Sequence, residues 1–274
     1  MPPDEEKRQE ELLLLLLALS SEAERRINQA VRPRLVEVMR RLRRLVQTMS
    51  PTGQFRLYEW TQIAPKALPL LEEITRTLRP NLLREVQAVR PSIQDAAYDF
   101  SQPSETKPQP LIPRTQQELL DTLNVAGAGS LAALMGYTRL NRYTLQMAKE
   151  LDILVRGMIL TEATTQEISD KVLKVTTANG KVVGKVKTGS FANKMWTRVK
   201  NTSAAVVWDG VAKTLDETWA DTAATEWVWN AVLDPALCPV CQPLAGQRRA
   251  ERGQFNRLPP LHPNCRCAVL PLFG

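Results

Sequence analysis

All four cysteines of this 274-residue chain and its single histidine lie between positions 238 and 267. The two halves of this cluster share one pattern, because Cys238-Pro239-Val240-Cys241 and His262-Pro263-Asn264-Cys265 each read ligand, proline, any residue, cysteine. A proline after the first ligand fixes φ and favours a turn that brings the fourth residue back beside the first. Two such turns supply the four sulfur and nitrogen donors that a tetrahedral zinc ion requires.

The spacing predicts a structural zinc site with Cys238, Cys241, His262 and Cys265 as ligands. Cys267, which forms a Cys-x-Cys pair with Cys265, is a substitute ligand. In this alternative, Cys267 replaces either His262 or Cys265 in the set. No open coordination position is evident, so we expect zinc to stabilise the fold, as it does in small modules with ~10–16 kcal/mol of apparent binding free energy. Two alternatives stay open. The cysteines form two disulfides, which need an oxidising compartment, or they are four unrelated buried thiols.

The residues around this cluster form a longer motif. It comprises Trp229-Asn230, Leu233-Asp234, Cys238-Pro239-x-Cys241, Leu244-Ala245-Gly246, Phe255, Pro259-Pro260 and His262-Pro263-Asn264-Cys265-Arg266-Cys267. This motif resembles the C-terminal signature of the phage Mu F-like head morphogenesis family. Residues 161–221 resemble the helical part of that family loosely, and residues 1–110 match none of it.

The resemblance implies a minor head (minor capsid) protein of a tailed phage. Such a protein is a structural component of the virion near the portal vertex, and it supports head assembly and DNA packaging or ejection. The implied partners are the portal protein, the major capsid protein and packaged DNA. The resemblance also implies multiple copies in a symmetric assembly, located in the virion head and, during assembly, in the host cytoplasm.

The composition predicts a mainly α-helical protein with a small C-terminal β module, because glycine is scarce and Leu, Ala, Arg and Glu abound. We expect a helical region over 1–100, a proline-rich linker over 101–114 and a helical domain over 115–222. That domain should hold a β-hairpin near 175–187, around Asn179-Gly180. The zinc module covers 223–274, and its strand over 226–234 can pair with residues 268–270.

Prolines are expected to divide the N-terminal region into short helices. The predicted helices cover 4–31 and 34–49, and further breaks should follow Pro65, Pro69, Pro80 and Pro91. Residues 12–17 are all leucine, which predicts a helix buried on every side, either against a partner or as the centre of its own domain. The apolar run is too short to span a membrane, and the acidic residues before it are untypical of a secretory signal. We therefore expect a protein of the reducing cytoplasm with no membrane contact.

The segment from Arg25 to Arg44 contains eight arginines and one acid, Glu37. Such a basic amphipathic helix is typical of contact with DNA, with an acidic partner surface such as the portal, or with an anionic membrane. A solvated face is the alternative. The alternative function is a zinc-containing nucleic-acid-binding module that contacts the phage genome through this helix. The candidate contact residues are Arg32, Arg34, Arg40, Arg41, Arg43 and Arg44.

A catalytic role is not expected. A single histidine, itself expected to bind metal, removes Ser-His-Asp, Cys-His and multi-histidine metal sites from consideration. The same residue argues against a metal-dependent nuclease, which is the third and weakest functional class. No pair of carboxylates stands out from the charges expected on helix surfaces.

Overall fold

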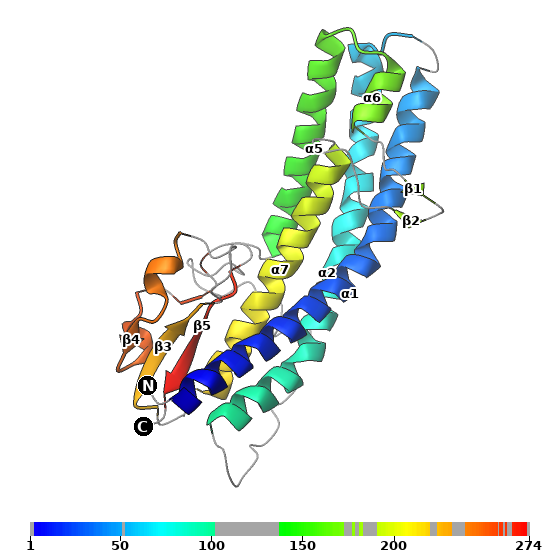
Figure 1. Cartoon of the computed structure of the whole chain (residues 1–274). Helices are drawn as coiled ribbons and strands as arrows, with labels where there is room; N and C mark the ends of the chain where they lie inside the picture. The colour runs from blue at the N-terminus through cyan, green and yellow to red at the C-terminus, as the bar shows by residue number, and fades with distance from the viewer. Residues whose placement is uncertain are drawn as a thin grey trace. The chain divides into compact units, whose positions relative to one another are not determined.

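The computed structural model describes residues 3–50, 53–101, 137–172, 177–178, 181–182, 191–219, 224–231, 239–256, 258–259, 261 and 265–272 (Figure 1). The protein is mainly helical, with a small three-stranded antiparallel sheet near the C-terminus, as the composition predicts. Its helices are α1 (Pro3–Met49), α2 (Leu57–Ser101), α5 (Tyr137–Leu160), α6 (Thr165–Val172) and α7 (Phe191–Thr218). The predicted linker lies almost wholly outside the described residues.

Five prolines that we expected to end helices lie inside them, so that expectation was wrong. Pro33 lies within α1, and Pro65, Pro69, Pro80 and Pro91 lie within α2. A proline in a helix interior costs about 3 kcal/mol, because it removes one N–H donor and crowds the carbonyl four residues earlier. All five side chains are exposed, so the affected carbonyls are on the solvent side, where water can bond them. The buried face continues past each proline.

The chain forms two compact units. The first comprises residues 1–26, 82–136 and 201–274, and the second comprises residues 27–81 and 137–200. Helices α1, α2 and α7 each contribute to both units.

The second unit is a helical bundle held by bonds between its helices. The Trp60 indole of α2 donates a hydrogen bond to Asp152 of α5 at 2.7 Å, and Arg198 of α7 pairs with Glu150 of α5. A capping box opens α6: the Glu167 N–H donates to the Thr164 hydroxyl at 3.2 Å, and the Thr164 N–H donates to the Glu167 carboxylate at 2.9 Å.

The predicted β-hairpin of this unit is also confirmed. Strand β1 (Thr177–Ala178) pairs antiparallel with β2 (Lys181–Val182), and the Ala178–Lys181 pair leaves two residues between the strands. Such a connection is the one that Asn-Gly favours.

The first unit has an aromatic core centred on Trp219. Its indole N–H donates to the Ala97 carbonyl of α2 at 3.1 Å. Its ring lies 6.2 Å from that of Phe100 and 6.3 Å from that of Trp227, centroid to centroid. These contacts join the end of α7 to α2 and to the C-terminal sheet, and such aromatic pairs contribute beyond their buried area.

The C-terminal sheet has strand order β4-β3-β5, with β3 (Glu226–Asn230) between β4 (Arg248–Arg249) and β5 (Ala268–Leu272) (Figure 1). Val228 lies opposite Leu270 on β5 and opposite Arg248 on β4. The predicted pairing of this strand with residues 268–270 is therefore confirmed for residues 226–230, whereas residues 232–234 of the predicted strand lie outside the described residues. Asn230 at the end of β3 donates to the Gln9 side chain of α1 at 2.9 Å, which ties the sheet to the N-terminal helix.

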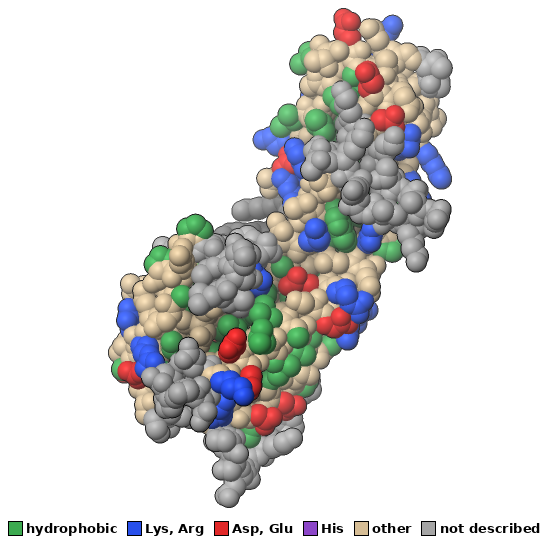
Figure 2. All heavy atoms as spheres, viewed as in Figure 1, with side chains coloured by type: hydrophobic (Ala, Val, Ile, Leu, Met, Phe, Trp, Pro, Cys, Tyr) green, Lys and Arg blue, Asp and Glu red, His purple; other side chains and the backbone are tan. Residues whose placement is uncertain are grey.

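The leucine run of α1 is not buried on every side, so the central-helix alternative was wrong for part of it. Leu12, Leu13 and Leu16 are buried, whereas Leu14 is 56% exposed and Leu15 is 46% exposed. Figure 2 shows hydrophobic side chains gathered over the N-terminal half of α1. Within the described parts of the chain, no helix has the length and apolar character needed to cross a membrane.

Candidate metal centre

Three of the four cysteines meet in the first unit. The sulfur atoms of Cys241, Cys265 and Cys267 all lie within 4.8 Å of one another, and all three residues are buried free thiols. The Cys241 and Cys265 sulfurs are 3.7 Å apart. Three converging buried sulfurs can hold a metal ion, and thiolate is a ligand that zinc prefers.

The distance of 3.7 Å between the Cys241 and Cys265 sulfurs matches that between two ligands of one metal ion. In a tetrahedral site with Zn–S bonds of ~2.3 Å, neighbouring sulfurs lie ~3.8 Å apart. A disulfide would place the two sulfurs ~2.05 Å apart. Tetrahedral coordination needs a fourth donor, and Cys238 and His262, the two remaining candidates from the sequence, lie outside the described residues.

Cys241 is positioned by a tight turn anchored on β3. Its carbonyl accepts the N–H groups of Leu244 at 3.0 Å and Ala245 at 3.2 Å, forming the 3₁₀ turn η1 (Gln242–Leu244). Gly246 then takes a φ of +78°, which glycine adopts without strain. Its N–H donates to the Trp229 carbonyl of β3 at 2.8 Å. The turn is thus hydrogen-bonded to the central strand of the sheet.

Cys265 and Cys267 are positioned by the strand that follows them. They lead directly into β5, which begins at Ala268. Residues two apart in an extended chain project to the same side, so both thiols face Cys241 and Arg266 projects away from them. The Cys-Arg-Cys alternation before an apolar strand is the sequence signal that places Cys267 within the cluster rather than beside it.

The thiols perturb one another's titration. A hydrogen bond from Cys267 lowers the pKa of Cys265 to about 5, against the opposing effect of burial. The same bond, together with burial, raises the pKa of Cys267. A divalent cation would stabilise both thiolates at once, because its charge favours the deprotonated form of each ligand.

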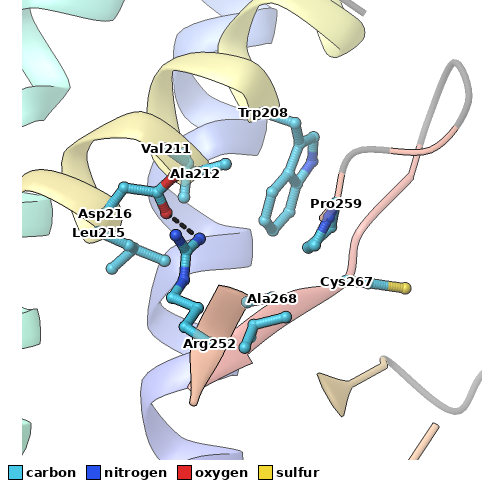
Figure 3. Close-up of a pocket in the computed structure, with 10 residues that line it drawn as sticks. Trp208, Val211, Ala212, Leu215, Asp216, Arg252, Pro259, Cys267 and Ala268 are labelled. Carbon is cyan, nitrogen blue, oxygen red and sulfur yellow. Dashed lines mark hydrogen bonds and ion pairs between the residues drawn. The ribbon is translucent and has the colours of Figure 1, made fainter. Parts of the chain in front are cut away.

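An ion pair joins the loop between β4 and β5 to α7. Arg252, in the 3₁₀ turn η2 (Arg252–Gln254), pairs with Asp216 (Figure 3). Its guanidinium lies 5.8 Å from the centroid of the Trp227 ring. Burial raises the pKa of Asp216, and Arg252 opposes the shift. A small cavity beside this pair is lined by Trp208, Leu215 and Pro259, among others. Figure 3 shows the Cys267 sulfur pointing away from these residues, so the cavity is not the metal site.

A half-buried acid of α1, Glu24, interacts electrostatically with the same module. Burial raises the pKa of Glu24 to about 7, and the charge of Arg266 acts in the opposite direction. Arg266 stands between Cys265 and Cys267, so the two residues link α1 electrostatically to the cysteine segment. This relationship joins residues 242 positions apart in the sequence, which no local pattern indicates.

The six candidate contact arginines lie on α1 in the second unit, and four interact within it. Arg34 and Arg41 both bond to Glu73 of α2, at 2.8 Å and 2.9 Å. Arg43 donates to the Ser169 hydroxyl of α6 at 2.9 Å. The Arg32 guanidinium lies 6.0 Å from the centroid of the Trp196 ring. Arg40 and Arg44 are exposed.

Comparisons of the chain with protein-family models, with curated proteins and with solved structures found no match.

Proposed function

We propose that this chain is a minor head protein of a tailed phage and that a structural zinc ion holds its C-terminal module. The observation that carries the proposal is the convergence of Cys241, Cys265 and Cys267. These cysteines belong to the motif that resembles the Mu F-like signature, and the described part of that motif forms the three-stranded sheet and the turns around it.

Zinc is the metal that this donor set favours, because it binds cysteine sulfur in closed tetrahedral sites. Three thiolates and a fourth ligand, Cys238 or His262, would fill such a site and leave no position for a substrate. We therefore propose a structural role and no enzymatic activity. The module has a short sheet, so a metal crosslink between the η1 turn and β5 would supply much of its stability.

The exposure of Leu14 and Leu15 supports the proposal that a partner protein binds this part of α1. Two adjacent leucines about half exposed on a helix are costly to leave in water, at ~25 cal/mol per Å² of apolar surface. Ala18, one turn later, is also exposed and leaves room for close approach of another helix. We assign this face to contact with the portal protein or the major capsid protein. In this proposal, several copies are arranged symmetrically near the portal vertex of the virion head. Assembly takes place in the host cytoplasm.

The first test uses virions of the phage that encodes the chain. Mass spectrometry should detect the chain in intact particles and, after heads and tails are separated, in the head fraction together with the portal protein. Absence of the chain from purified virions would contradict the proposal. Metal analysis of the isolated protein tests the zinc separately, so a failure of either part is distinguishable.

The second test addresses the leucine face with a matched pair of variants. The double variant L14S/L15S, supplied in place of the natural chain, should fold but be missing from virions. The control is L145S/I153S, which removes apolar side chains that are 57% and 60% exposed on α5. Equal incorporation of both variants would remove the role given to Leu14 and Leu15.

A further inference from the structure

The two units carry opposite net charges. The second unit, residues 27–81 and 137–200, has 22 basic and 9 acidic residues, a net charge of +13. The first unit has 14 basic and 20 acidic residues, a net charge of −6. The overall charge of +7 therefore understates the charge of the helical bundle. A charge of this size on one part of a protein is the electrostatic feature of polyanion binding.

Arg40 and Arg44 are the arginines of the basic helix that remain available for a partner. They are one turn apart on α1, about 6 Å along the helix axis, and both are exposed. Within the described residues, neither forms a hydrogen bond or ion pair, whereas Arg34, Arg41 and Arg43 bond to acids or hydroxyls of the bundle. The structure thus separates arginines that hold the bundle together from arginines that face outward.

Exposed cations also occur on the other long helices of this unit. They are Lys66 and Arg76 on α2, Lys149 on α5, and Lys194 and Lys200 on α7. No ion pair engages these five side chains in the part of the chain that the structure describes. Cations spread over several helices suit an extended, repeating anion better than a single carboxylate cluster.

The side chains around Arg40 and Arg44 favour DNA over an anionic membrane or an acidic protein surface as the partner. No large apolar side chain is exposed on α1 between residues 27 and 49. A membrane-binding helix needs apolar residues to insert, and a protein interface usually has an apolar centre. The phosphate backbone of DNA needs neither, since arginine binds phosphate through its planar, bidentate donors.

We infer that the second unit binds the phosphate backbone of double-stranded DNA without reading its base sequence, with Arg40 and Arg44 in direct contact. This inference does not depend on the proposed function, because it follows from the charges of the bundle and from the bonds of its arginines. The acidic first unit stays outside the contact, since its net charge repels phosphate.

The test measures binding of the full-length protein to a fluorescein-labelled mixed-sequence duplex of about 30 base pairs by fluorescence anisotropy, at salt concentrations from ~50 to ~250 mM. The natural chain should bind two unrelated duplexes equally, with an affinity that falls steeply with salt. The double variant R40A/R44A should bind more weakly, and the slope of log K against log salt should be shallower by about 2, close to one for each lost phosphate contact.

The matched control is K7A/R25A, which removes the same charge from exposed positions of the same helix in the first unit. Its binding and salt slope should equal those of the natural chain. Circular dichroism and thermal melting should show that both variants fold, and R40K/R44K should retain most of the affinity.

Four results would overturn the inference. The first two are that the natural chain does not bind DNA at low salt, or that R40A/R44A and K7A/R25A lose affinity equally. The other two are that polyglutamate displaces the duplex at equal charge concentration, or that the chain binds phosphatidylcholine–phosphatidylserine vesicles in place of DNA.

Discussion

The sulfur atoms of Cys241 and Cys265 lie 3.7 Å apart, although the two residues are 24 positions apart in the sequence. One comes from a turn hydrogen-bonded to β3, and the other comes from the segment that leads into β5. Because β3 and β5 are neighbouring strands, the sheet brings the two sulfurs to the distance expected at one metal ion. The strands and the thiols therefore depend on each other for their placement.

Replacing Cys267 by serine should weaken metal binding as much as replacing Cys241 or Cys265. Loss of one thiolate from a four-ligand zinc site should cost about 3 kcal/mol, roughly a quarter of the binding free energy of a structural site. The measurements are zinc stoichiometry of the purified variant and its melting temperature with and without a chelator.

The control is A268S, which places a hydroxyl at the buried position next to Cys267 without removing a ligand. It should keep its zinc. Two outcomes would contradict the metal assignment: full zinc content in C267S, or a natural chain whose melting temperature does not respond to a chelator.

Replacing Arg252 by alanine should loosen the C-terminal module from α7. The variant leaves the partly buried Asp216 without its partner and removes the cation from the Trp227 ring, which together should cost about 1–3 kcal/mol of unfolding free energy. Urea unfolding measures the change. R248A is the matched control, because Arg248 pairs with Glu226 on the surface and should contribute less than about 1 kcal/mol.

Replacing Gly210 by alanine should destabilise the first unit. A Cβ at this position of α7 would lie 2.6 Å from a methyl carbon of Val86 on α2, so one helix must shift, at a cost of about 1–3 kcal/mol. G157A tests the reverse case, because nothing lies within 4 Å of a Cβ there. In α5 that change should stabilise by about 0.5–1 kcal/mol. Thermal unfolding of the two variants should shift in opposite directions.

Replacing Glu24 by glutamine should flatten the dependence of stability on pH. The pKa of Glu24 is about 7 in the folded protein and 4.5 in the reference state, so the folded state holds the proton more tightly. The resulting stabilisation is fully present below pH 4.5 and is lost as pH rises through 7. Because the side chain is only partly buried, the loss should be about 1–2 kcal/mol.

The measurement for Glu24 is the unfolding free energy of the natural chain and of E24Q at several values between pH 4.5 and 8. The difference between the two proteins should change across this range. Parallel curves would show that Glu24 titrates normally. E22Q serves as the control, since Glu22 lies on the same helix and its pKa is lowered to about 2 by Arg25 and Arg26, so it stays ionised throughout.

Several elements could be predicted because short stretches of sequence specify them. The Thr164–Glu167 capping box, the Asn179-Gly180 hairpin and the alternating strand from Glu226 each depend on residues within a few positions of one another. The predicted helix breaks were wrong, because a proline on the exposed face of a helix leaves the packing of its buried face intact. In α2 the prolines are spaced by four, eleven and eleven residues, which keeps them on one face. That face is exposed, so the packing of the opposite face continues.

The sequence by itself determined the helical class, the position of the C-terminal strands and the concentration of thiols near the chain end, because these follow from composition, periodicity and spacing. Only the tertiary structure decided which thiols converge, which arginines bond to Glu73 and Ser169, and which leucines of α1 stay exposed. Each of these outcomes depends on a partner many residues away. Its position is set by the packing of whole helices and strands, a long-range property that no local pattern contains.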